Sequence, residues 1–497
     1  MHPFRAIIRR PFVLDLRALA LLRMGTAAVL LLDLAIRSTD LEAHYANLGV
    51  LPVAALVERV WTPYQFSLHA SSGLWQAQAA LFALAAAAAG ALLLGYHTRL
   101  ATLVSWILLV SLQNRNPLIG QGGDDLLRML LFWGFFLPWG RIWSRDTRSL
   151  PPPARYDYVS AATVAYIVQL ALLYWCTAIL KSGREWTHDG TALYYALSLD
   201  QLLLPGGRLL YPHPDLLRFL TFATWYTELL LPIALFIPFR VVWWRFLVIG
   251  VLTCFHIGIS LTLFVGIFFI INFVSLLGLL PPVALNWLAP RLAQSSTWTR
   301  QWQTKLPAWQ LPWQIRIERT RPSSPTRIQL GRAVRETLVY ATLAYICWWN
   351  IDDVTKPGRW MSAPTRWFGY LFRIDQHWGM FAPTVFKDDG WFILEGTTKT
   401  GQLIDLNRQG HPVSYTKPRA IVKLFKNDRW RKYSESYLFI DNSWMRPYYC
   451  NYLLRIWHQN SGNQSLTNLK VIYMKEVSLP DYQKSPVTRE VLCDCAP

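Results

Sequence analysis

Charged residues are scarce in this chain, and this scarcity limits the class of protein that it can be. Only 16% of its 497 residues are Asp, Glu, Lys or Arg, whereas 53% are hydrophobic and the mean hydropathy is +0.21. Soluble globular domains usually carry about 25% charged residues, so the composition indicates a membrane protein. The 25 tryptophans fit aromatic belts at the two interfaces of a bilayer.

Cysteine is also rare, and the spacings typical of metal sites are absent. No CxxC or HExxH pattern occurs, so no metal is expected. Three of the six cysteines lie inside apolar runs, where a free Cys behaves as a small hydrophobe: Cys176, Cys254 and Cys347. The other three, Cys450, Cys493 and Cys495, lie in the polar C-terminal part and can form at most one disulfide among themselves.

Acidic residues are the scarcer charged class, with 30 Asp and Glu against 49 Lys and Arg, which gives a net charge of +19. The basic residues flank apolar runs, where they attract anionic lipid headgroups. No basic stripe with interleaved aromatics lies on a polar helix pattern, so nucleic acid is not expected as a partner. Membrane lipids are the expected surroundings.

Long apolar runs dominate the rest of the chain and predict a mostly α-helical, polytopic membrane bundle of about nine transmembrane segments. A full span needs about 20 residues, so the third and fourth runs are short. The nine runs are Leu16–Ile36, Leu74–Gly95, Leu100–Leu112, Leu126–Gly140, Val159–Leu180, Phe219–Phe239, Val241–Leu263, Phe264–Leu288 and Ala333–Asn350.

The segment "QNRNPLIGQGGDD", residues 113–125, separates the two short runs and is polar and rich in glycine. Backbone of this kind lies at membrane depth only where protein buries it or where it lines a cavity. Short, interrupted helices point to a binding site, although a plain connecting loop explains the segment equally well.

The charge distribution predicts the orientation and the domain limits. The N-terminus is basic, and residues 289–335 hold nine Lys and Arg against one acid. By the positive-inside rule both lie in the cytoplasm, and nine spans place the C-terminal part outside it. The predicted division is an eight-segment membrane domain, a basic cytoplasmic linker, a ninth transmembrane helix and an extracytoplasmic domain: 1–290, 291–332, 333–350 and 351–497.

The C-terminal part is long enough for one small α+β domain. "DGWFILEGTTKTGQLIDL" (389–406) alternates in two stretches around a Thr-Gly turn, which predicts a β-hairpin. "RPYYCNYLLRIWHQNSG" (446–462) has helical spacing, and "NLKVIYMKEV" (468–477) predicts a further strand.

Lys181 is the first candidate for chemistry, because it ends the apolar run Val159–Leu180. A lysine at a helix end commonly extends to the headgroups as an anchor. The predicted orientation, however, places it on the side that the positive-inside rule disfavours for lysine. A desolvated amine can also serve as a base near neutral pH. Residue types alone favour the anchor.

Other ionisable residues inside the apolar runs are candidates for function or for interior hydrogen bonds. His256 lies in the middle of the seventh run, and Glu228 on the sixth run needs a partner. Arg23 and Asp33 are ten residues apart on the first run, so they are not expected to pair with each other.

Asp124 and Arg128 are four residues apart, which predicts a structural pair on one helix face with Asp124 or Asp125 near the helix start.

Two stretches of this sequence resemble the horizontally transferred transmembrane (HTTM) domain, the membrane part of vitamin K-dependent γ-glutamyl carboxylase. They are "DLRALALLRMGTAAVLLLDLAIRSTDLEAHYANLGVLP" (15–52) and "RNPLIGQGGDDLLRMLLFW" (115–133). Lys181 with Trp186, followed by "GTALYYAL", is similar to the carboxylase segment that bears the lysine taken as its base. "FHIGISLTLFVGIF" resembles a later helix with a histidine, which His256 matches.

The resemblance implies an integral membrane enzyme. A lysine base would deprotonate a lipid hydroquinone of the vitamin K or menaquinone type, oxygen would add, and the strong base formed would take the γ-proton of a peptide glutamate, which then binds carbon dioxide. Lys181 and His256 are the implied catalytic residues. The residues implied to bind the quinone are Arg115, Asn116, Trp186 and Glu228.

The chain departs from the carboxylase at two points. Asn116 stands where the carboxylase has a histidine, and an amide cannot exchange protons. The C-terminal part is also short, so the region that binds a propeptide is missing. A related quinol reaction or peptide modification is therefore expected, and the alternative is a non-enzymatic membrane protein acting in immunity, peptide export or solute handling.

Overall fold

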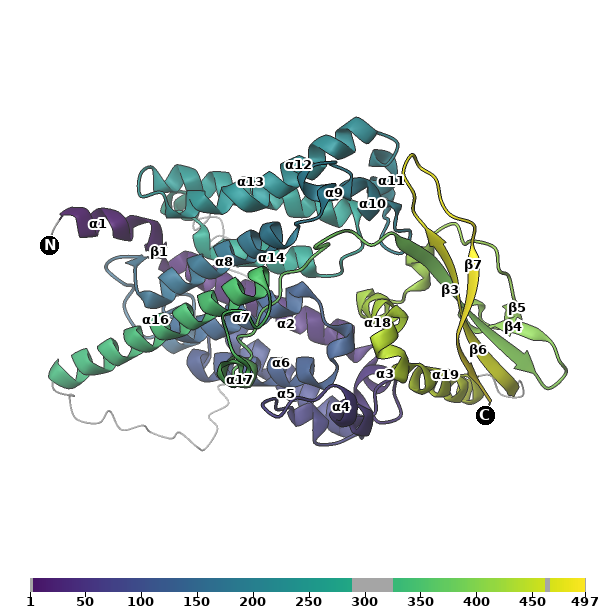
Figure 1. The fold of residues 1–497 in the computed structure, drawn as a ribbon. Coiled ribbons are helices and arrows are strands. Elements are labelled where there is room, and N and C mark those ends of the chain that lie inside the picture. The colour runs from purple at the N-terminus through teal and green to yellow at the C-terminus, as the bar shows by residue number, and fades with distance from the viewer. Residues whose placement is uncertain (1–2, 288–324, 461–464, 497) are drawn as a thin grey trace.

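The computed structural model describes residues 3–287, 325–460 and 465–496, and most of them are helical. The long helices form a bundle, and a five-stranded sheet lies at one end of it (Figure 1). The N-terminus lies at the other end of the bundle (Figure 1). This arrangement confirms the prediction of a helical protein with a small α+β region near the C-terminus.

In the described residues, nine helices overlap the nine predicted apolar runs. They are α2 (Leu16–Ser38), α5 (Trp75–Leu94), α6 (Thr98–Arg115), α7 (Gly122–Phe136), α8 (Ala161–Leu180), α12 (Pro214–Leu230), α13 (Val241–Thr262), α14 (Phe268–Leu276) and α16 (Pro325–Thr355). Short elements connect them: α1 (Pro3–Arg9), α3 (Leu41–Tyr45), α4 (Val53–Arg59), α9 (Arg184–Thr187), α10 (Ala192–Ser198), α11 (Pro205–Leu210), β1 (Leu14–Asp15) and β2 (Asp157–Tyr158).

Five helices of the described part are long and apolar enough to cross a membrane: Leu16–Ser38, Trp75–Leu94, Ala161–Leu180, Pro214–Phe236 and Val241–Thr262. The count of nine spans stays a prediction, because the other helices are shorter or less apolar.

The eighth run differs most from its expected form. It contains the short helix α14, which begins just after Gly266, a residue in a left-handed conformation with φ of 59°.

Local sequence explains where the long helices begin and end. At the start of α2 the Asp15 carboxylate accepts the Arg17 N–H at 2.8 Å. Helix α8 begins with a capping box, in which the Ser160 N–H donates to Thr163 Oγ1 at 3.0 Å. Helix α5 ends at Gly95, whose φ of 65° closes the helix.

The boundary around the ninth helix also needs correction. Helix α16 extends beyond 333–350 at both ends, so residues 325–332 are helical rather than part of a linker. The rest of the predicted linker, 291–324, lies outside the described residues. The tail domain, by which we mean the described residues after α16, therefore begins at residue 356 rather than 351.

The tail domain holds an antiparallel sheet of order β5-β4-β3-β6-β7. The predicted hairpin and strand are confirmed as β3 with β4 and as β6, and the predicted helix is α19. The strands are β3 (Asp388–Thr398), β4 (Leu403–Asp405), β5 (His411–Pro412), β6 (Leu466–Val477) and β7 (Thr488–Cys495). The helices are α17 (Ala363–Leu371), α18 (Asp428–Leu438) and α19 (Arg446–Asn460).

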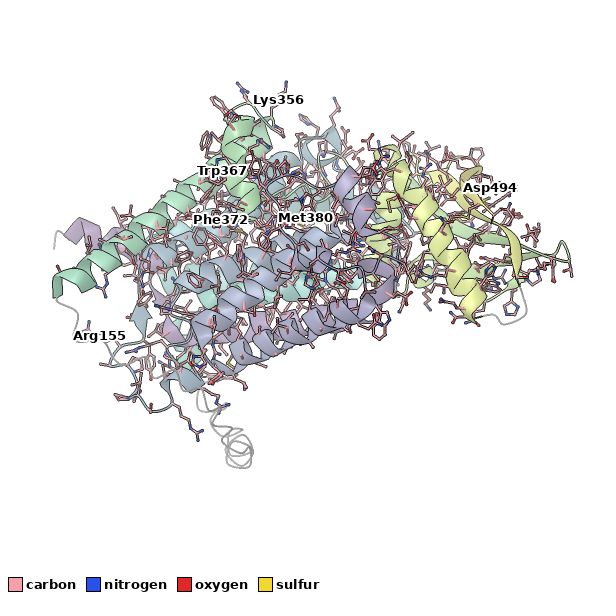
Figure 2. All side chains as sticks on the ribbon, turned by 90° about the horizontal axis from the view of Figure 1, so that it is seen from below. Arg155, Lys356, Trp367, Phe372, Met380 and Asp494 are labelled. Atoms are coloured by element: carbon pink, nitrogen blue, oxygen red, sulfur yellow. A yellow bond between two sulfur atoms is a disulfide. The ribbon has the colours of Figure 1, made fainter. Side chains whose placement is uncertain are left out.

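Two regions join the tail domain to the bundle. Helices α18 and α19 lie between the sheet and the bundle (Figure 1). The segment from α17 to β3 includes Met380, which lines the cavity described below, and Arg155 and Asp494 lie at opposite ends of the molecule (Figure 2). The candidate site lies where these parts meet.

Candidate functional site

Lys181 is buried at the C-terminal end of α8 and forms an ion pair. Its Nζ donates to both carboxylate oxygens of Glu228 on α12, at 2.7 and 2.6 Å. Only 4% of the Lys181 side chain and 6% of the Glu228 side chain are exposed. A lysine that anchors in lipid headgroups would be exposed, so this geometry contradicts the anchor hypothesis.

Trp186 completes the surroundings of the amine. The Lys181 Nζ lies 4.5 Å from the centre of the Trp186 ring, which is within the range of a cation–π contact. The tail domain holds this ring in place, because Trp186 Nε1 donates to the Phe381 carbonyl at 2.9 Å. The Gly183 N–H donates in addition to the Pro383 carbonyl at 3.0 Å. The position of Trp186 beside the amine therefore depends on the tail domain.

His256 lies on α13 and is buried beside the same space. Its Nε2 is 3.0 Å from the hydroxyl of Tyr174 on α8. Among the described residues the buried Nδ1 has no hydrogen-bond partner. The rings of Phe255 and Phe268 contact the imidazole and keep its surroundings apolar. The structure thus places a histidine and a phenol together as one hydrogen-bonding pair.

A cavity of about 360 Å³ connects these groups. Cavities of about 300–1,000 Å³ commonly hold small ligands. Lys181, Trp186, Glu228 and His256 all line it. Much of the remaining wall is apolar and includes Leu173, Leu202, Ile259, Leu263, Val265 and Phe268. The cavity therefore combines an apolar wall with one buried acid–base pair.

The tail domain contributes further charged residues to the cavity wall, which the sequence interpretation missed. Its cavity-lining charged or titratable residues are His377, Arg431, Lys432 and Glu435. Arg431 Nη1 and Lys432 Nζ both donate to Glu435, at 3.0 and 2.9 Å. The hydrogen bond from His377 to Asp353 raises the pKa of that imidazole. No local pattern marks these four residues, because the contact arises only when the tail domain packs on the bundle.

Tyr174 was also missed, although the sequence contains a signal for it. Tyr174, Thr177 and Lys181 are spaced three and four residues apart, which places them on one face of α8. All three line the cavity. The helical spacing from Lys181 therefore predicts that Tyr174 faces the same space.

Arg115 and Asn116 do not belong to this site, which corrects the expectation that they bind a quinone beside Lys181. Both are buried at the end of α6, outside the wall of the cavity. Arg115 Nη2 donates to the Ala46 carbonyl at 3.4 Å, and Asn116 Nδ2 donates to the His44 carbonyl at 3.0 Å. The end of α6 is therefore bonded to α3 and the turn after it.

Asp33 and Asp124 form a second buried cluster, the closed ionic network, together with Arg37 and Arg429. Arg37 on α2 donates to Asp33 and to Asp124, each at 2.7 Å. Arg429 on α18 donates to Asp33 at 2.7 Å and to Asp124 at 2.6 Å. Because Arg429 belongs to the tail domain, this network joins α18 to helices α2 and α7.

The predicted pair of Asp124 and Arg128 does not form. Arg128 instead pairs with Asp125 at 3.0 Å, three residues away, and donates to Gln113 at 2.8 Å. Arg37 and Arg429 occupy the Asp124 carboxylate, which leaves no room for Arg128. The expected place of Asp124 near the helix start is confirmed, since its carboxylate accepts the Gln121 N–H at 2.9 Å.

Arg23 and Asp33 do not pair with each other, as the spacing on α2 predicted. The Arg23 guanidinium is fully buried and donates to the backbone carbonyls of Leu92 and Trp143, at 2.5 and 2.6 Å. Its charge is therefore balanced by carbonyl dipoles rather than by a carboxylate.

Two groups in the described part bring metal-ligating atoms together. One is the cysteine group of the tail domain, and the other consists of Asp200, Asp389 and Glu476, whose carboxylates lie within 4.8 Å of one another. Lys417 and Lys484 both bond to this acidic group. The two ammonium groups already supply the positive charge that a cation would bring.

Comparison with models of protein families, with curated proteins and with solved structures finds no match to this chain. The likeness to the HTTM domain therefore stays a prediction from the motifs in the sequence.

Proposed function

We propose that this chain is an integral membrane enzyme in which Lys181 acts as a base on a lipid hydroquinone, as the resemblance to the γ-glutamyl carboxylase implies. One observation carries the proposal. The Lys181–Glu228 pair is buried in the wall of a cavity whose remaining wall is largely apolar. A pair that served packing alone would not need a cavity of about 360 Å³ beside it.

The residues present fit a reduced isoprenoid quinone. Its ring and the first part of its tail would contact the apolar wall formed by α8, α13 and α14, and its hydroxyl groups would meet Lys181 and His256. When bound, the hydroquinone would supply an ionisable hydroxyl and, through its reaction with oxygen, a base strong enough for carbon acids.

Glu228 gives Lys181 a route to its reactive form. An amine acts as a base only after it loses its proton, and Glu228 accepts hydrogen bonds from the ammonium at both oxygens. Burial removes water from both groups, which narrows the free-energy gap between the ion pair and the neutral amine–acid pair. Glu228 would hold the proton while Lys181 accepts one from the ligand, and the His256–Tyr174 pair would orient a ligand oxygen.

A peptide substrate would approach from the side of the tail domain. His377, Arg431, Lys432 and Glu435 offer charged and hydrogen-bonding groups there, in addition to the polar groups of the bundle.

The proposed topology has nine membrane segments, a cytoplasmic N-terminus and an extracytoplasmic tail domain. Two features support it. The N-terminus and the sheet lie at opposite ends of the bundle (Figure 1), and the tail domain contains a disulfide, which persists in oxidising compartments. An impermeant thiol reagent added to intact cells should label Cys493, and labelling only from the cytoplasmic side would contradict the orientation.

The function is tested with purified protein, a reduced menaquinone-type quinone and oxygen, by measuring quinone epoxide. Lys181→Ala should lower the rate by about 10²–10⁴-fold, the usual contribution of a general base. Lys181→Arg is the sharper variant, because arginine can still pair with Glu228 but does not lose its proton in proteins. Full activity in Lys181→Arg would remove the base hypothesis.

A matched control is the ion pair of Lys426 and Asp40, which lies outside the cavity. Its Nζ and Oδ1 atoms are 2.7 Å apart. Lys426→Ala should keep the epoxidation rate of the unchanged protein. If folded wild-type protein forms no epoxide with any quinol, the result favours the non-enzymatic alternative.

A further inference from the structure

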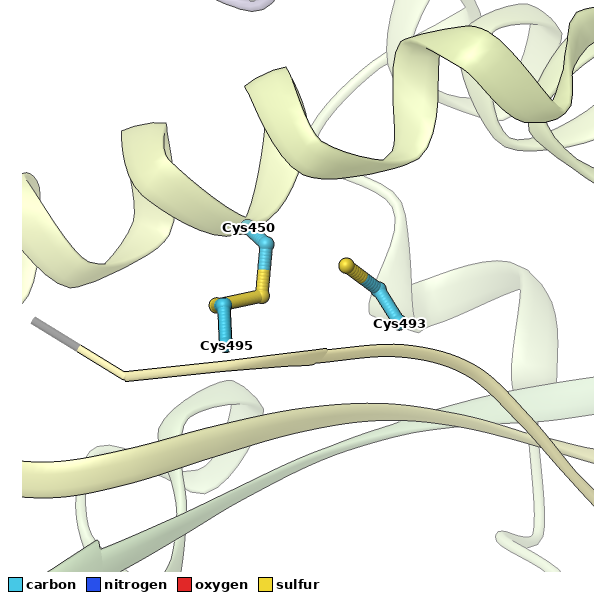
Figure 3. A group of neighbouring side chains, drawn as sticks. All are labelled: Cys450, Cys493 and Cys495. Atoms are coloured by element: carbon cyan, nitrogen blue, oxygen red, sulfur yellow. A yellow bond between two sulfur atoms is a disulfide. The ribbon is translucent and has the colours of Figure 1, made fainter.

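Three cysteines of the tail domain meet at one point. Cys450 on α19 forms a disulfide with Cys495 on β7, and Cys493, two residues earlier on the same strand, carries a free thiol. The three sulfur atoms lie within 4.8 Å of one another (Figure 3). The quinone site makes no use of this group, which belongs to a different part of the tail domain.

The pleat of β7 explains why both of its cysteines face the helix. Alternate residues of a strand point to the same face, so Cys493 and Cys495 both point toward α19. In Figure 3 the sulfur of Cys450 lies between the sulfurs of Cys495 and Cys493. A thiolate displaces a disulfide partner by approaching the central sulfur opposite the leaving sulfur, and Cys493 lies on that side.

Strand geometry also determines which sulfur can be attacked. A bond from Cys493 to Cys495 would join two residues whose Cα atoms are about 6.6 Å apart in an extended strand and whose side chains are nearly parallel. That separation is at the upper limit for a disulfide, and the two side chains do not converge. Cys450 faces the strand from α19, and its sulfur lies within 4.8 Å of the Cys493 sulfur.

We propose that Cys450, Cys493 and Cys495 form a thiol–disulfide exchange centre in which Cys450 alternates between the other two cysteines. The thiolate of Cys493 attacks Cys450 Sγ, and the new S–S bond forms as the bond to Cys495 breaks. Cys495 leaves as a thiolate and takes up the proton that Cys493 released. One disulfide and one thiol are present before and after, so no oxidant or reductant is consumed.

The burial of the attacking thiol determines the rate of this exchange. Burial raises the pKa of the Cys493 thiol, so only a small fraction is thiolate near neutral pH. Uncatalysed disulfide rearrangement takes minutes to hours, and a buried attacking thiol belongs to the slow part of that range. Since two of the three sulfurs are bonded to each other, the group offers one thiolate rather than a set of three metal ligands.

The test identifies which cysteine is free in the full-length protein in detergent. Samples are incubated for a day near neutral pH, and free thiols are then blocked with an alkylating reagent. Cleavage before Asp494 places Cys493 and Cys495 on separate peptides, which mass spectrometry distinguishes. Exchange predicts alkylated Cys493 in one fraction of the molecules and alkylated Cys495 in the other. Alkylation of Cys493 alone, with Cys495 always disulfide-bonded, would overturn the proposal.

Two variants give an independent answer. In Cys495→Ser, incubated with oxidised glutathione as the oxidant, the Cys450–Cys493 disulfide should form, and Cys493 should lose its alkylation almost completely. In Cys493→Ser the Cys450–Cys495 disulfide should remain, and Cys495 should never be alkylated. Folded Cys495→Ser protein in which Cys450 and Cys493 are both alkylated would contradict the geometry and exclude the exchange.

Discussion

The molecule contains two buried ionic clusters that differ in what surrounds them. The closed ionic network of Asp33, Arg37, Asp124 and Arg429 pairs each carboxylate with both arginines and joins three helices. The Lys181–Glu228 pair has one cation and one carboxylate and borders a cavity. Buried charge that is fully paired by neighbouring charges indicates a role in structure, whereas buried charge beside a cavity can act on a ligand.

The pairing of the closed network has a consequence for stability. Two carboxylates and two guanidinium groups balance to zero charge, and Arg429 brings one of the two cations from the tail domain. Removing one partner of such a cluster leaves a buried charge without compensation, which costs far more than removing an exposed pair.

Arg429→Ala should therefore have the largest effect on stability. We expect the free energy of unfolding to fall by about 3–5 kcal/mol, because Asp33 and Asp124 would share only Arg37. Unfolding in detergent, followed by tryptophan fluorescence, measures the loss. Arg429→Lys should recover only part of it, since one ammonium cannot reproduce the planar, bidentate contacts. A loss below about 1 kcal/mol for Arg429→Ala would show that the network does not join the two parts of the protein.

The double substitution Lys181→Met with Glu228→Leu sharpens the comparison. It replaces the ion pair with apolar side chains, so the stability should stay within about 1–2 kcal/mol of the unchanged protein. Epoxidation should nevertheless fall by about 100-fold or more, because the base is gone. The assay is the one described for Lys181, run alongside unfolding in detergent. If activity survives in this folded variant, the cavity does not work through Lys181.

Sequence alone could predict the elements whose signal is local. The apolar runs located the long helices, and the alternation in 389–406 located the hairpin. The hydrophobic pattern also identified Lys181, His256 and Glu228, because an ionisable residue inside an apolar run stands out against its neighbours.

Sequence could not predict contacts that depend on the packing of distant segments. Asp124 pairs with Arg429, 305 residues away, rather than with the nearby Arg128. The spacing of four residues along the helix does not reveal that a distant arginine competes with Arg128 for the Asp124 carboxylate. The resemblance likewise implied Arg115 and Asn116 as quinone ligands, whereas in the structure the end of α6 bonds to α3 and the turn after it.

A third cluster is intermediate between the closed ionic network and the Lys181–Glu228 pair, because its positive and negative charges are unequal. It contains the three carboxylates of Asp200, Asp389 and Glu476 and only two lysines that pair with them. Burial and the neighbouring Asp200 raise the pKa of Asp389 to about 6. The fold therefore favours the neutral carboxyl group of Asp389. The stabilisation of the folded protein that results is complete below the ordinary pKa of about 4 and is lost as the pH rises through 6.

Asp389→Asn should remove this pH dependence. We expect the variant to gain about 1–3 kcal/mol relative to the unchanged protein at pH 8 and to show little difference at pH 3.5, where the Asp389 carboxyl group is largely neutral in both the folded and the unfolded state. Unfolding in detergent at both pH values measures the change, and Glu42→Gln, whose carboxylate is a half-exposed partner of Arg455, serves as the control. An equal effect at the two pH values would mean that Asp389 is charged throughout.

The smallest expected effect concerns the pair of Lys426 and Asp40, which also joins the tail domain to the bundle. The Lys426 side chain is 56% exposed, and Asp40 keeps hydrogen bonds from Thr39 and Asn427 when the lysine is removed. Lys426→Ala should therefore cost less than about 1 kcal/mol of the free energy of unfolding near pH 7. A loss as large as that of Arg429→Ala would show that the exposure of Lys426 does not make its ion pair weaker than the contacts of the buried Arg429.

The pH dependence of that small loss identifies its cause. Burial acts to raise the pKa of Asp40, but hydrogen bonds from Lys426 and other donors outweigh burial and leave the pKa lowered. A lowered pKa stabilises the fold above the ordinary pKa of a carboxyl group, and the stabilisation is lost as the pH falls through the lowered value. The difference between Lys426→Ala and the unchanged protein should thus shrink toward zero in acid. If the difference persists when Asp40 is protonated, it comes from the hydrogen bond of Lys426 to the Thr39 carbonyl at 2.9 Å rather than from charge.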